Sequence, residues 1–301
     1  MYVRLFFLGS IKQYSVVKIS HSNDLTTSVK RIECNDLIVT EEPLEIWLSA
    51  HPAAAPVLLF TTMRTPGDDL NLVKGWLYSS GAIEDITKIT SIYHTGTGRL
   101  KSQSTNRVQV NLGDGANFDF AVYQRVEIMN SACGVCGQHS IENLLDKLPQ
   151  GLTLDASISR LPIAAIGALA QQLRDKQKIF EQTGGNHGVA LFDHRLQVLD
   201  VREDVGRHNA LDKLIGANMP MLAVDNHSIA SSVGLVLSSR ASFELVQKAA
   251  MVNVRYIIAM GAPSSLAIDL AKDCDMCLIG FIKSSAVSME FNVYSNPHML
   301  V

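Results

Sequence analysis

The sequence predicts an α/β protein in which a smaller β-rich N-terminal part precedes a domain with a mostly parallel sheet. In the last third of the chain, apolar runs of strand length alternate with helical segments in a β-α-β-α-β order. Near-continuous apolar strands of this kind are typical of parallel sheets covered on both faces. Hydrophobic residues make up 47% and charged residues 18% of the chain, which is typical of folded globular proteins.

Residues 1–129 are predicted to form the β-rich domain. Its apolar runs contain β-branched and aromatic residues and are separated by Gly, Pro and Asp turns. One helix interrupts them, begins after a capping Asp68 or Asp69 and stops at Gly81. The predicted strands are residues 3–9, 37–49, 55–63 and 107–113.

Residues 130–150 are predicted to form a loop and a linker helix. The stretch 130–139 holds small, flexible residues around two cysteines and shows neither helical nor strand periodicity, which favours an exposed loop. A helix over residues 141–148 is expected to follow, with Ser140 as its cap.

Residues 151–301 are predicted to form the α/β domain. Apolar spacing predicts one helix over residues 162–180, ended by Gly184 and Gly185, and later a helix from Gly206 to Gly216. A hairpin of strands 188–193 and 196–201 lies between them. The final alternation consists of strands 233–239, 255–261 and 277–283 and helices 241–251 and 264–272.

Three segments at the carboxyl ends of the predicted parallel strands carry hydroxyl groups, namely residues 238–240, 261–265 and 283–285. Ligands of such sheets bind beyond these strand ends, and helix N-termini there favour anions. Arg240 and Lys283 add positive charge. We therefore expect a phosphate-binding crevice; the alternative is that the serines, Ser264 among them, only cap helices.

A second polar cluster comprises residues 183–187 and 202–213. Gly184 and Gly185 permit a close approach of ligand to backbone, and the helix start suits an anion. The alternative is a packed junction in which Asp204, Arg207 and Asp212 form structural ion pairs. The candidate ligand residues are Gly184, Gly185, His187, Arg207 and His208.

Cys133 and Cys136 form a CGVCG loop that is the predicted reactive centre. Sulfur transfer needs a thiolate that attacks a donor persulfide, carries the extra sulfur and delivers it to an acceptor. Two cysteines separated by two residues, with glycines beside them, suit this chemistry. One cysteine of the pair would hold the persulfide, and its neighbour would assist release of the sulfur.

Zinc binding is the main alternative use of the cysteines. Cys274 and Cys277 form a second CxxC pair, and four cysteines suffice for a structural zinc site. The two pairs lie far apart in the predicted fold, so buried thiols at these two positions are the favoured interpretation. Zinc-deaminase chemistry is excluded because no His precedes a Glu by two residues and Ala132 stands where Pro is needed.

Charge and hydropathy limit the expected partners. A formal charge of -3 gives no basic face for nucleic acid. No apolar run reaches membrane-spanning length, and the first fifteen residues lack a secretory pattern. We expect a cytoplasmic protein that binds neither nucleic acid nor a membrane.

With these motifs the chain resembles the formate dehydrogenase accessory sulfurtransferase (FdhD) family, over most of its length. The resemblance implies a cytidine-deaminase-like α/β domain, a homodimer and no metal of the protein's own. The blocks that carry it are RTPGDD from Arg64, NSACGVCG from Asn130, TGGNH from Thr183, REDVGRHNALDK from Arg202, SSRASFELVQKA from Ser238, APSSLAIDLA from Ala262, LIGFIK from Leu278 and FNVY from Phe291.

The resemblance implies that sulfur passes from a cysteine desulfurase to the molybdenum bis(guanine dinucleotide) cofactor of formate dehydrogenase. Cys133 would carry the persulfide with Cys136 as its partner, and GDP would mimic the bound cofactor. A non-covalent cofactor-binding chaperone is the alternative function. The segment that matches the family's cofactor-binding stretch is Phe281, Ile282, Lys283, Ser284, Ser285 and Ala286.

Overall fold

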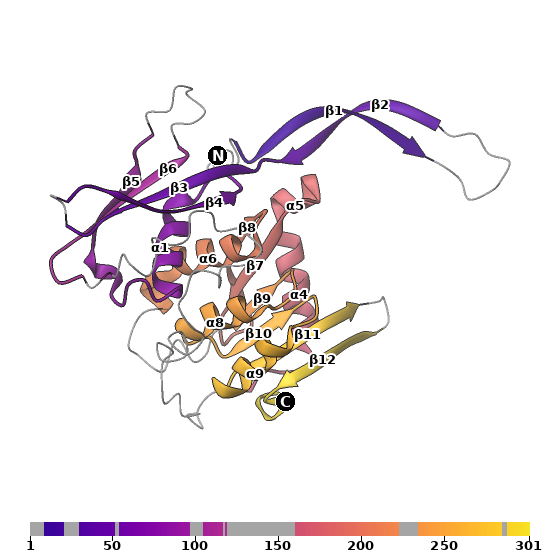
Figure 1. The fold of residues 1–301 in the computed structure, drawn as a ribbon. Helices are drawn as coiled ribbons and strands as arrows, with labels where there is room; N and C mark the ends of the chain where they lie inside the picture. The colour runs from indigo at the N-terminus through magenta and orange to yellow at the C-terminus, as the bar shows by residue number, and fades with distance from the viewer. Residues whose placement is uncertain are drawn as a thin grey trace.

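The computed structural model describes residues 9–20, 30–51, 54–96, 105–116, 118, 160–222, 234–284 and 288–301. The cysteine loop, the helix predicted at 141–148, most of the strand predicted at 3–9 and the predicted domain boundaries lie outside these residues. Strands in the described part form a two-stranded ribbon, a four-stranded sheet and a six-stranded sheet (Figure 1).

The four-stranded sheet has the order β4-β3-β6-β5, and helix α1 packs on one of its faces. Alternate residues of β3, such as Leu44 and Ile46, point into a core shared with Trp76 of α1. The strands predicted over residues 55–63 and 107–113 and the helix are confirmed, and β3 covers the second part of the strand predicted over residues 37–49. Bounds are β3 Glu42–Ser49, β4 Val57–Arg64, α1 Asp69–Ser79, the 3-10 turn η1 Ile86–Lys88, β5 Ile89–His94 and β6 Arg107–Leu112.

The ribbon consists of β1 (Ile11–Ser20) and β2 (Lys30–Val39), which pair antiparallel. The strand predicted over residues 37–49 is therefore wrong in its continuity, because β2 ends before β3 begins. At the break the Thr40 N–H donates to the Ser10 carbonyl at 2.8 Å, which turns the chain from the ribbon into the sheet. Neither the ribbon nor β5 was predicted from the sequence.

The predicted β-α-β-α-β unit is confirmed. Strand β10 lies between β9 and β11 and pairs parallel with both. Its elements are β9 Gly234–Leu237, α8 Phe243–Met251, β10 Tyr256–Ala259, α9 Ser265–Asp273 and β11 Cys277–Ser284.

The expectation of a mostly parallel sheet is wrong, because three of the five pairings in the six-stranded sheet are antiparallel. The predicted hairpin, β7 (His187–Phe192) and β8 (Val198–Asp204), extends the sheet antiparallel beside β9. The unpredicted strand β12 (Met289–Ser295) returns antiparallel along β11, and the 3-10 turn η4 (Pro297–Met299) follows it.

The single helix predicted over residues 162–180 is two helices, α4 (Ala165–Lys176) and α5 (Lys178–Thr183). Gln177 breaks the run with a non-helical ψ of 81°. Glu203 of β8 then accepts the N–H groups of Ile179 at 2.9 Å and Phe180 at 2.8 Å. A carboxylate at a helix start satisfies the free N–H groups there, which stabilises the break.

Helix α6 (Arg207–Leu222) continues past Gly216, so the predicted helix end is wrong. Gly216 instead lies where α6 crosses α1. A Cβ built there would lie 1.9 Å from the Asn71 carbonyl oxygen, and a Cβ at Gly75 would lie 1.9 Å from the Asp212 carbonyl oxygen. The two helix backbones are in direct contact, which only glycine permits at these positions.

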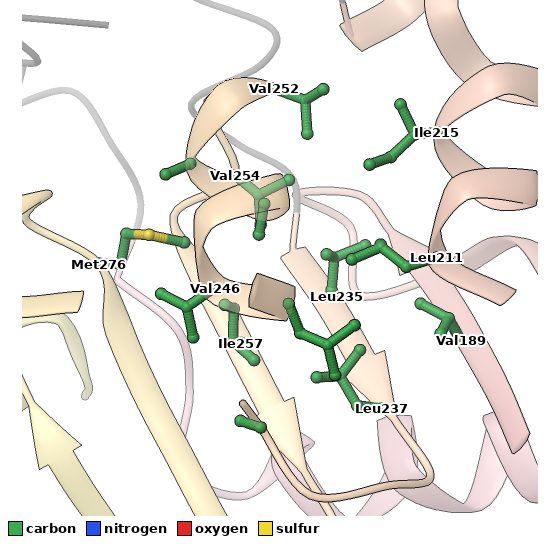
Figure 2. Close-up of a cluster of buried hydrophobic side chains, with 14 of the residues drawn as sticks. Val189, Leu211, Ile215, Leu235, Leu237, Val246, Val252, Val254, Ile257 and Met276 are labelled. Carbon is green, nitrogen blue, oxygen red and sulfur yellow. The ribbon is translucent and has the colours of Figure 1, made fainter. Parts of the chain in front are cut away.

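Hydrophobic cores cover both faces of the six-stranded sheet. On one face, side chains of α6, α8 and α9 meet Leu235, Leu237 and Ile257 (Figure 2). On the other face, α4 packs on Val236 and Ile258. Adjacent strand residues thus alternate between the cores, as a doubly covered sheet requires. Across the described ranges, no helix is both long and apolar enough to span a bilayer.

Gly75→Ala and Gly216→Ala should each lower the free energy of unfolding by about 3 kcal/mol, because the added methyl collides with backbone that cannot move aside. Urea denaturation of the purified variants measures this. Gly167→Ala is the matched control, since its Cβ would meet only the flexible end of Met289, and a change below about 1 kcal/mol is expected. Wild-type stability in both crossing variants would contradict the backbone contact.

Candidate functional site

The two polar clusters expected from the sequence meet at one edge of the six-stranded sheet. Strand β7 begins where β9 ends, and Gly188 donates to the Ser238 hydroxyl at 2.8 Å while Ser238 donates to the Gly188 carbonyl at 2.9 Å. The starts of α6, α8 and α9 lie at the same edge. We call this edge the rim and define it as residues 186–188, 204–208, 238–242, 261–264 and 280–283.

The three strand-end segments pack closely along the rim. Gly261 donates to the Ser239 carbonyl at 3.1 Å and accepts from the Phe281 N–H at 3.1 Å. A Cβ on Gly261 would lie 2.7 Å from Cγ of Arg240. Two of the predicted ligand segments and the first part of the third therefore form one continuous surface, with Arg240 exposed on it.

A bulge in β11 places Phe281 and Lys283 on the rim. Phe281 has a φ of 58° and is 45% exposed, although the left-handed region costs a non-glycine residue about 1–2 kcal/mol. The Lys283 ammonium lies 4.7 Å from the centre of the Phe281 ring. Ile282 packs inward, whereas the Ser284 side chain, Ser285 and Ala286 lie outside the described residues.

Arg207 is the cation at the start of α6. Its Nε is buried and has no hydrogen-bond partner in the described part of the chain. The two acids of this cluster pair with lysines rather than with Arg207. Asp204 pairs with Lys213 at 2.7 Å, and Asp212 pairs with Lys248 at 2.9 Å. Each of these acids thus has a lysine partner, and the Arg207 Nε is a donor to which an anion could bind.

His187 and Asn186 lie beside this arginine at the start of β7. Burial, reinforced by the charge of Arg207, lowers the pKa of His187, while Asp204 opposes the shift. The imidazole is therefore neutral near pH 7 and offers hydrogen bonds without added charge. The buried Nδ2 of Asn186 also has no partner among the described residues, so a second donor is unsatisfied here.

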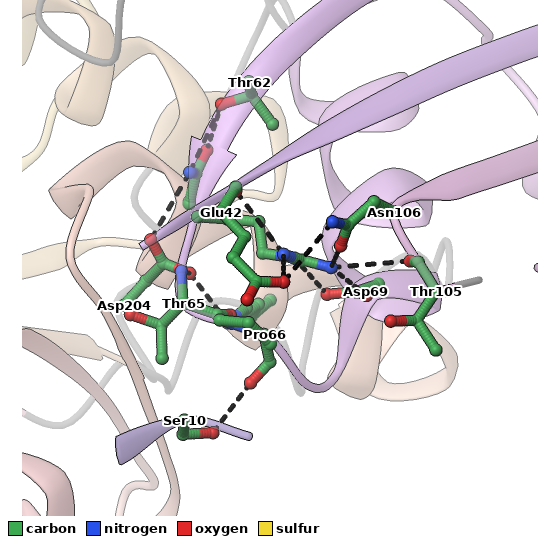
Figure 3. A network of polar contacts seen from close by, with 12 residues as sticks. Ser10, Glu42, Thr62, Thr65, Pro66, Asp69, Thr105, Asn106 and Asp204 are labelled. Carbon is green, nitrogen blue, oxygen red and sulfur yellow. Dashed lines mark hydrogen bonds and ion pairs between the residues drawn. The ribbon is translucent and has the colours of Figure 1, made fainter. Parts of the chain in front are cut away.

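Thr65 joins the N-terminal part to the rim (Figure 3). This role of Thr65 was not predicted from the sequence. Its N–H donates to Asp204 at 3.1 Å, its hydroxyl accepts from the Val205 N–H at 3.1 Å, and its carbonyl accepts from Lys213 at 2.8 Å. The one sequence feature that could have indicated this role is that Thr65 lies in the RTPGDD block. Neighbouring Arg64, fully buried, forms a two-point pair with Asp69, both contacts at 2.9 Å.

Three other predicted ligand residues have structural contacts. His208 is buried, with Nε2 3.3 Å from both the Ser242 hydroxyl and a Glu244 carboxylate oxygen. Ser264 caps α9 by accepting the Ala267 N–H at 3.3 Å, as the alternative interpretation predicted. Gly184 is the left-handed end of α5, with a φ of 66°.

The backbone of Gly185 lies close to the ribbon. A Cβ built on Gly185 would lie 2.6 Å from Cγ1 of Val39, at the base of β2. The glycine is therefore required for packing between the ribbon and the chain that leads into His187.

Cys133 and Cys136 lie outside the described residues. The thiols of the second pair belong to different cores: Cys277 is buried on the α4 side of the sheet, and Cys274 packs on the opposite side. Burial raises the pKa of Cys274 to about 11 and that of Cys277 to about 12. No group of three metal-ligating side chains occurs within the described ranges.

Cys274 and Cys277 should resist alkylation at pH 8. With a pKa near 11, about one Cys274 molecule in a thousand is a thiolate, and still fewer Cys277 molecules are. Peptide mapping after timed iodoacetamide treatment should show both reacting at least about a hundredfold more slowly than in the urea-unfolded chain. Rates similar to those of the unfolded chain would contradict their burial.

Known proteins match this chain over most of its length. The FdhD/NarQ family profile matches residues 39–301. "Sulfur carrier protein FdhD" of Streptomyces avermitilis is 37% identical over 88% of this chain and 89% of its own. The Corynebacterium efficiens protein of the same name is 41% identical over 86% and 89%.

A solved structure shares the fold. It is that of a proposed formate dehydrogenase accessory protein from Desulfotalea psychrophila, with a TM-score of 0.66, 20% identity and coverage of 95% of this chain and 99% of that one. The family match over residues 39–301 and the two relatives named above show that the chain belongs to the FdhD/NarQ family.

Proposed function

We propose that this protein is a sulfurtransferase. It takes persulfide sulfur from a cysteine desulfurase and passes it to the molybdenum bis(guanine dinucleotide) cofactor of formate dehydrogenase, in the cytoplasm. Family membership, the names of the relatives and the CGVCG motif support the proposal. We also propose that the α/β part has a cytidine-deaminase-like fold.

The chemistry assigned to Cys133 is exchange at sulfur. The Cys133 thiolate attacks the outer sulfur of the donor persulfide, the donor S–S bond breaks, and the donor cysteine leaves as a thiolate. Cys133 then holds the persulfide without any net oxidation. Attack by Cys136 on Cys133 would release the outer sulfur as hydrosulfide and leave a disulfide between the two residues.

The rim is the proposed cofactor site. The single observation that carries this assignment is Arg207, whose buried Nε has no partner in the described structure. A dinucleotide brings a diphosphate, and arginine binds phosphate oxygens through several N–H groups at once. Arg240 and Lys283 add exposed positive charge on the same surface, and α8 and α9 direct their N-termini toward it.

Incubation with a cysteine desulfurase and cysteine should add the mass of one sulfur atom to Cys133. Intact-protein mass spectrometry of the wild type, Cys133→Ala and Cys277→Ala measures this, with Cys277→Ala as a control that removes a buried thiol. The control should load like the wild type. A wild-type protein that gains no sulfur, or a Cys133→Ala protein that gains as much, would remove Cys133 from the mechanism.

The same variants separate sulfur transfer from non-covalent cofactor binding. If the protein acts only as a cofactor-binding chaperone, Cys133→Ala leaves activation of formate dehydrogenase intact. If it transfers sulfur, activation is lost while GDP still binds.

GDP should bind at the rim, and Arg207→Ala should weaken it about tenfold or more through loss of a charge-assisted contact. Isothermal titration calorimetry of the full chain measures the affinity. Arg195→Ala is the matched control, because Arg195 is exposed in the β7–β8 turn at the opposite end of the sheet. This variant should bind GDP as tightly as the wild type does. Equal affinities for both variants would remove Arg207 from the site.

A further inference from the structure

Arg174, in the last turn of α4, reaches the carboxyl end of β10. Its Nη2 lies 3.7 Å from Sδ of Met260, and Met260 directly precedes the rim segment 261–264. The arginine is exposed, so a ligand has access to its other N–H groups. No role for Arg174 was predicted from the sequence.

The contacts of Arg174 orient its side chain without neutralising its charge. The guanidinium carbon lies 4.9 Å from the centre of the Phe180 ring, and the thioether of Met260 is only a weak hydrogen-bond acceptor. Within the ranges that the structure describes, no carboxylate pairs with Arg174. An arginine held in this way loses less conformational freedom when it binds an anion.

Arg174 and Arg207 approach the rim from opposite faces of the six-stranded sheet. Helix α4 packs on the face that carries Ile258, whereas α6 packs on the face that carries Ile257. The charge of Arg207 acts on His187 at the start of β7, and the guanidinium of Arg174 lies at the end of β10. In the strand order β10-β9-β7 these strand ends are two positions apart, which is about 10 Å.

We propose that Arg174 is a second phosphate-binding arginine of the rim: a diphosphate that lies across the end of β9 is held by Arg207 from one face of the sheet and by Arg174 from the other. This inference rests on the proposed binding of a guanine dinucleotide at the rim. Two phosphate groups joined through one oxygen cover a gap of about 10 Å when each arginine adds a hydrogen bond of about 2.9 Å. The planar fork of a guanidinium matches phosphate oxygens at both ends.

A buried amide on the α4 side of the rim also indicates a polar ligand. Gln177, three residues after Arg174, is 1% exposed, and neither its Nε2 nor its Oε1 has a hydrogen-bond partner among the described residues. The amide lies against the start of β7, because a Cβ built on Gly188 would be 2.6 Å from Nε2. Buried amides are normally hydrogen-bonded, so this group indicates a site where a ligand supplies the partner.

A structural role at the end of α4 is the alternative for Arg174. A cation in the last turn of a helix is stabilised by the helix dipole, and Lys176 lies in the same turn. This role depends on charge alone, whereas phosphate binding also depends on the planar fork. A lysine at position 174 therefore distinguishes the two roles.

Isothermal titration calorimetry of the full chain with GDP tests the proposal, together with displacement of GDP by pyrophosphate. Arg174→Ala should weaken GDP binding about tenfold through loss of a charge-assisted contact, and should raise the pyrophosphate concentration needed for displacement from the rim. Arg174→Lys should bind GDP with an affinity between those of the wild type and Arg174→Ala, because lysine keeps the charge but lacks the fork. Both variants should keep the wild-type midpoint of urea denaturation, since Arg174 is exposed.

Lys178→Ala is the matched control, because it removes an exposed positive charge four residues away, whose partner is Glu181 at 3.2 Å. It should bind GDP as tightly as the wild type does. Equal affinities of Arg174→Ala and Lys178→Ala, wild-type affinity of Arg174→Lys, or pyrophosphate that does not displace GDP would overturn the role of Arg174. In each of these cases, weakened binding by Arg207→Ala would still support the proposed cofactor site. A wild type that binds no GDP would overturn that site and this inference together.

Discussion

The backbone contact between α1 and α6 is the constraint on which the arrangement of the molecule depends. Because Gly75 and Gly216 allow the two helices to touch, the N-terminal sheet sits directly on the α/β part. The chain just before α1 then reaches the start of α6, where Thr65 binds both Asp204 and Lys213. Side chains at either glycine would separate the helices and remove the support of the rim from one side.

The buried acids at this junction each have a lysine partner. Burial raises the pKa of Asp212 to about 6 against the opposing effect of Lys248, so the carboxylate is ionised at neutral pH and needs its lysine. Asp204 is likewise matched by Lys213. The buried Nε of Arg207 has no partner among the described residues, and this supports the proposal that the rim binds an anionic ligand.

Sequence patterns predicted the elements whose signals are local. The β-α-β-α-β unit, the β7–β8 hairpin and α1 carry apolar periodicity and turn residues within each segment. What failed depends on distant contacts: Gly216 looks like a helix end until α1 is placed against it, and Gln177 breaks a helix because Glu203 caps the next one. The sheet is mixed because β12 pairs antiparallel with β11 and β7 pairs antiparallel with β9, and no local pattern encodes either choice. The same holds for the site, where Arg207 was predicted but the dependence of its surroundings on Thr65 was not.

The ribbon and the rim are linked by a short length of chain. Gly185 contacts Val39 at the ribbon base, and the next two residues are Asn186 and His187 at the start of β7. A partner that fixes the ribbon therefore also restrains the segment that carries two rim side chains. The Nδ2 of Asn186, which has no partner in the described part of the chain, lies in that segment, so contacts made by the ribbon and by a ligand at the proposed cofactor site would act on the same few residues.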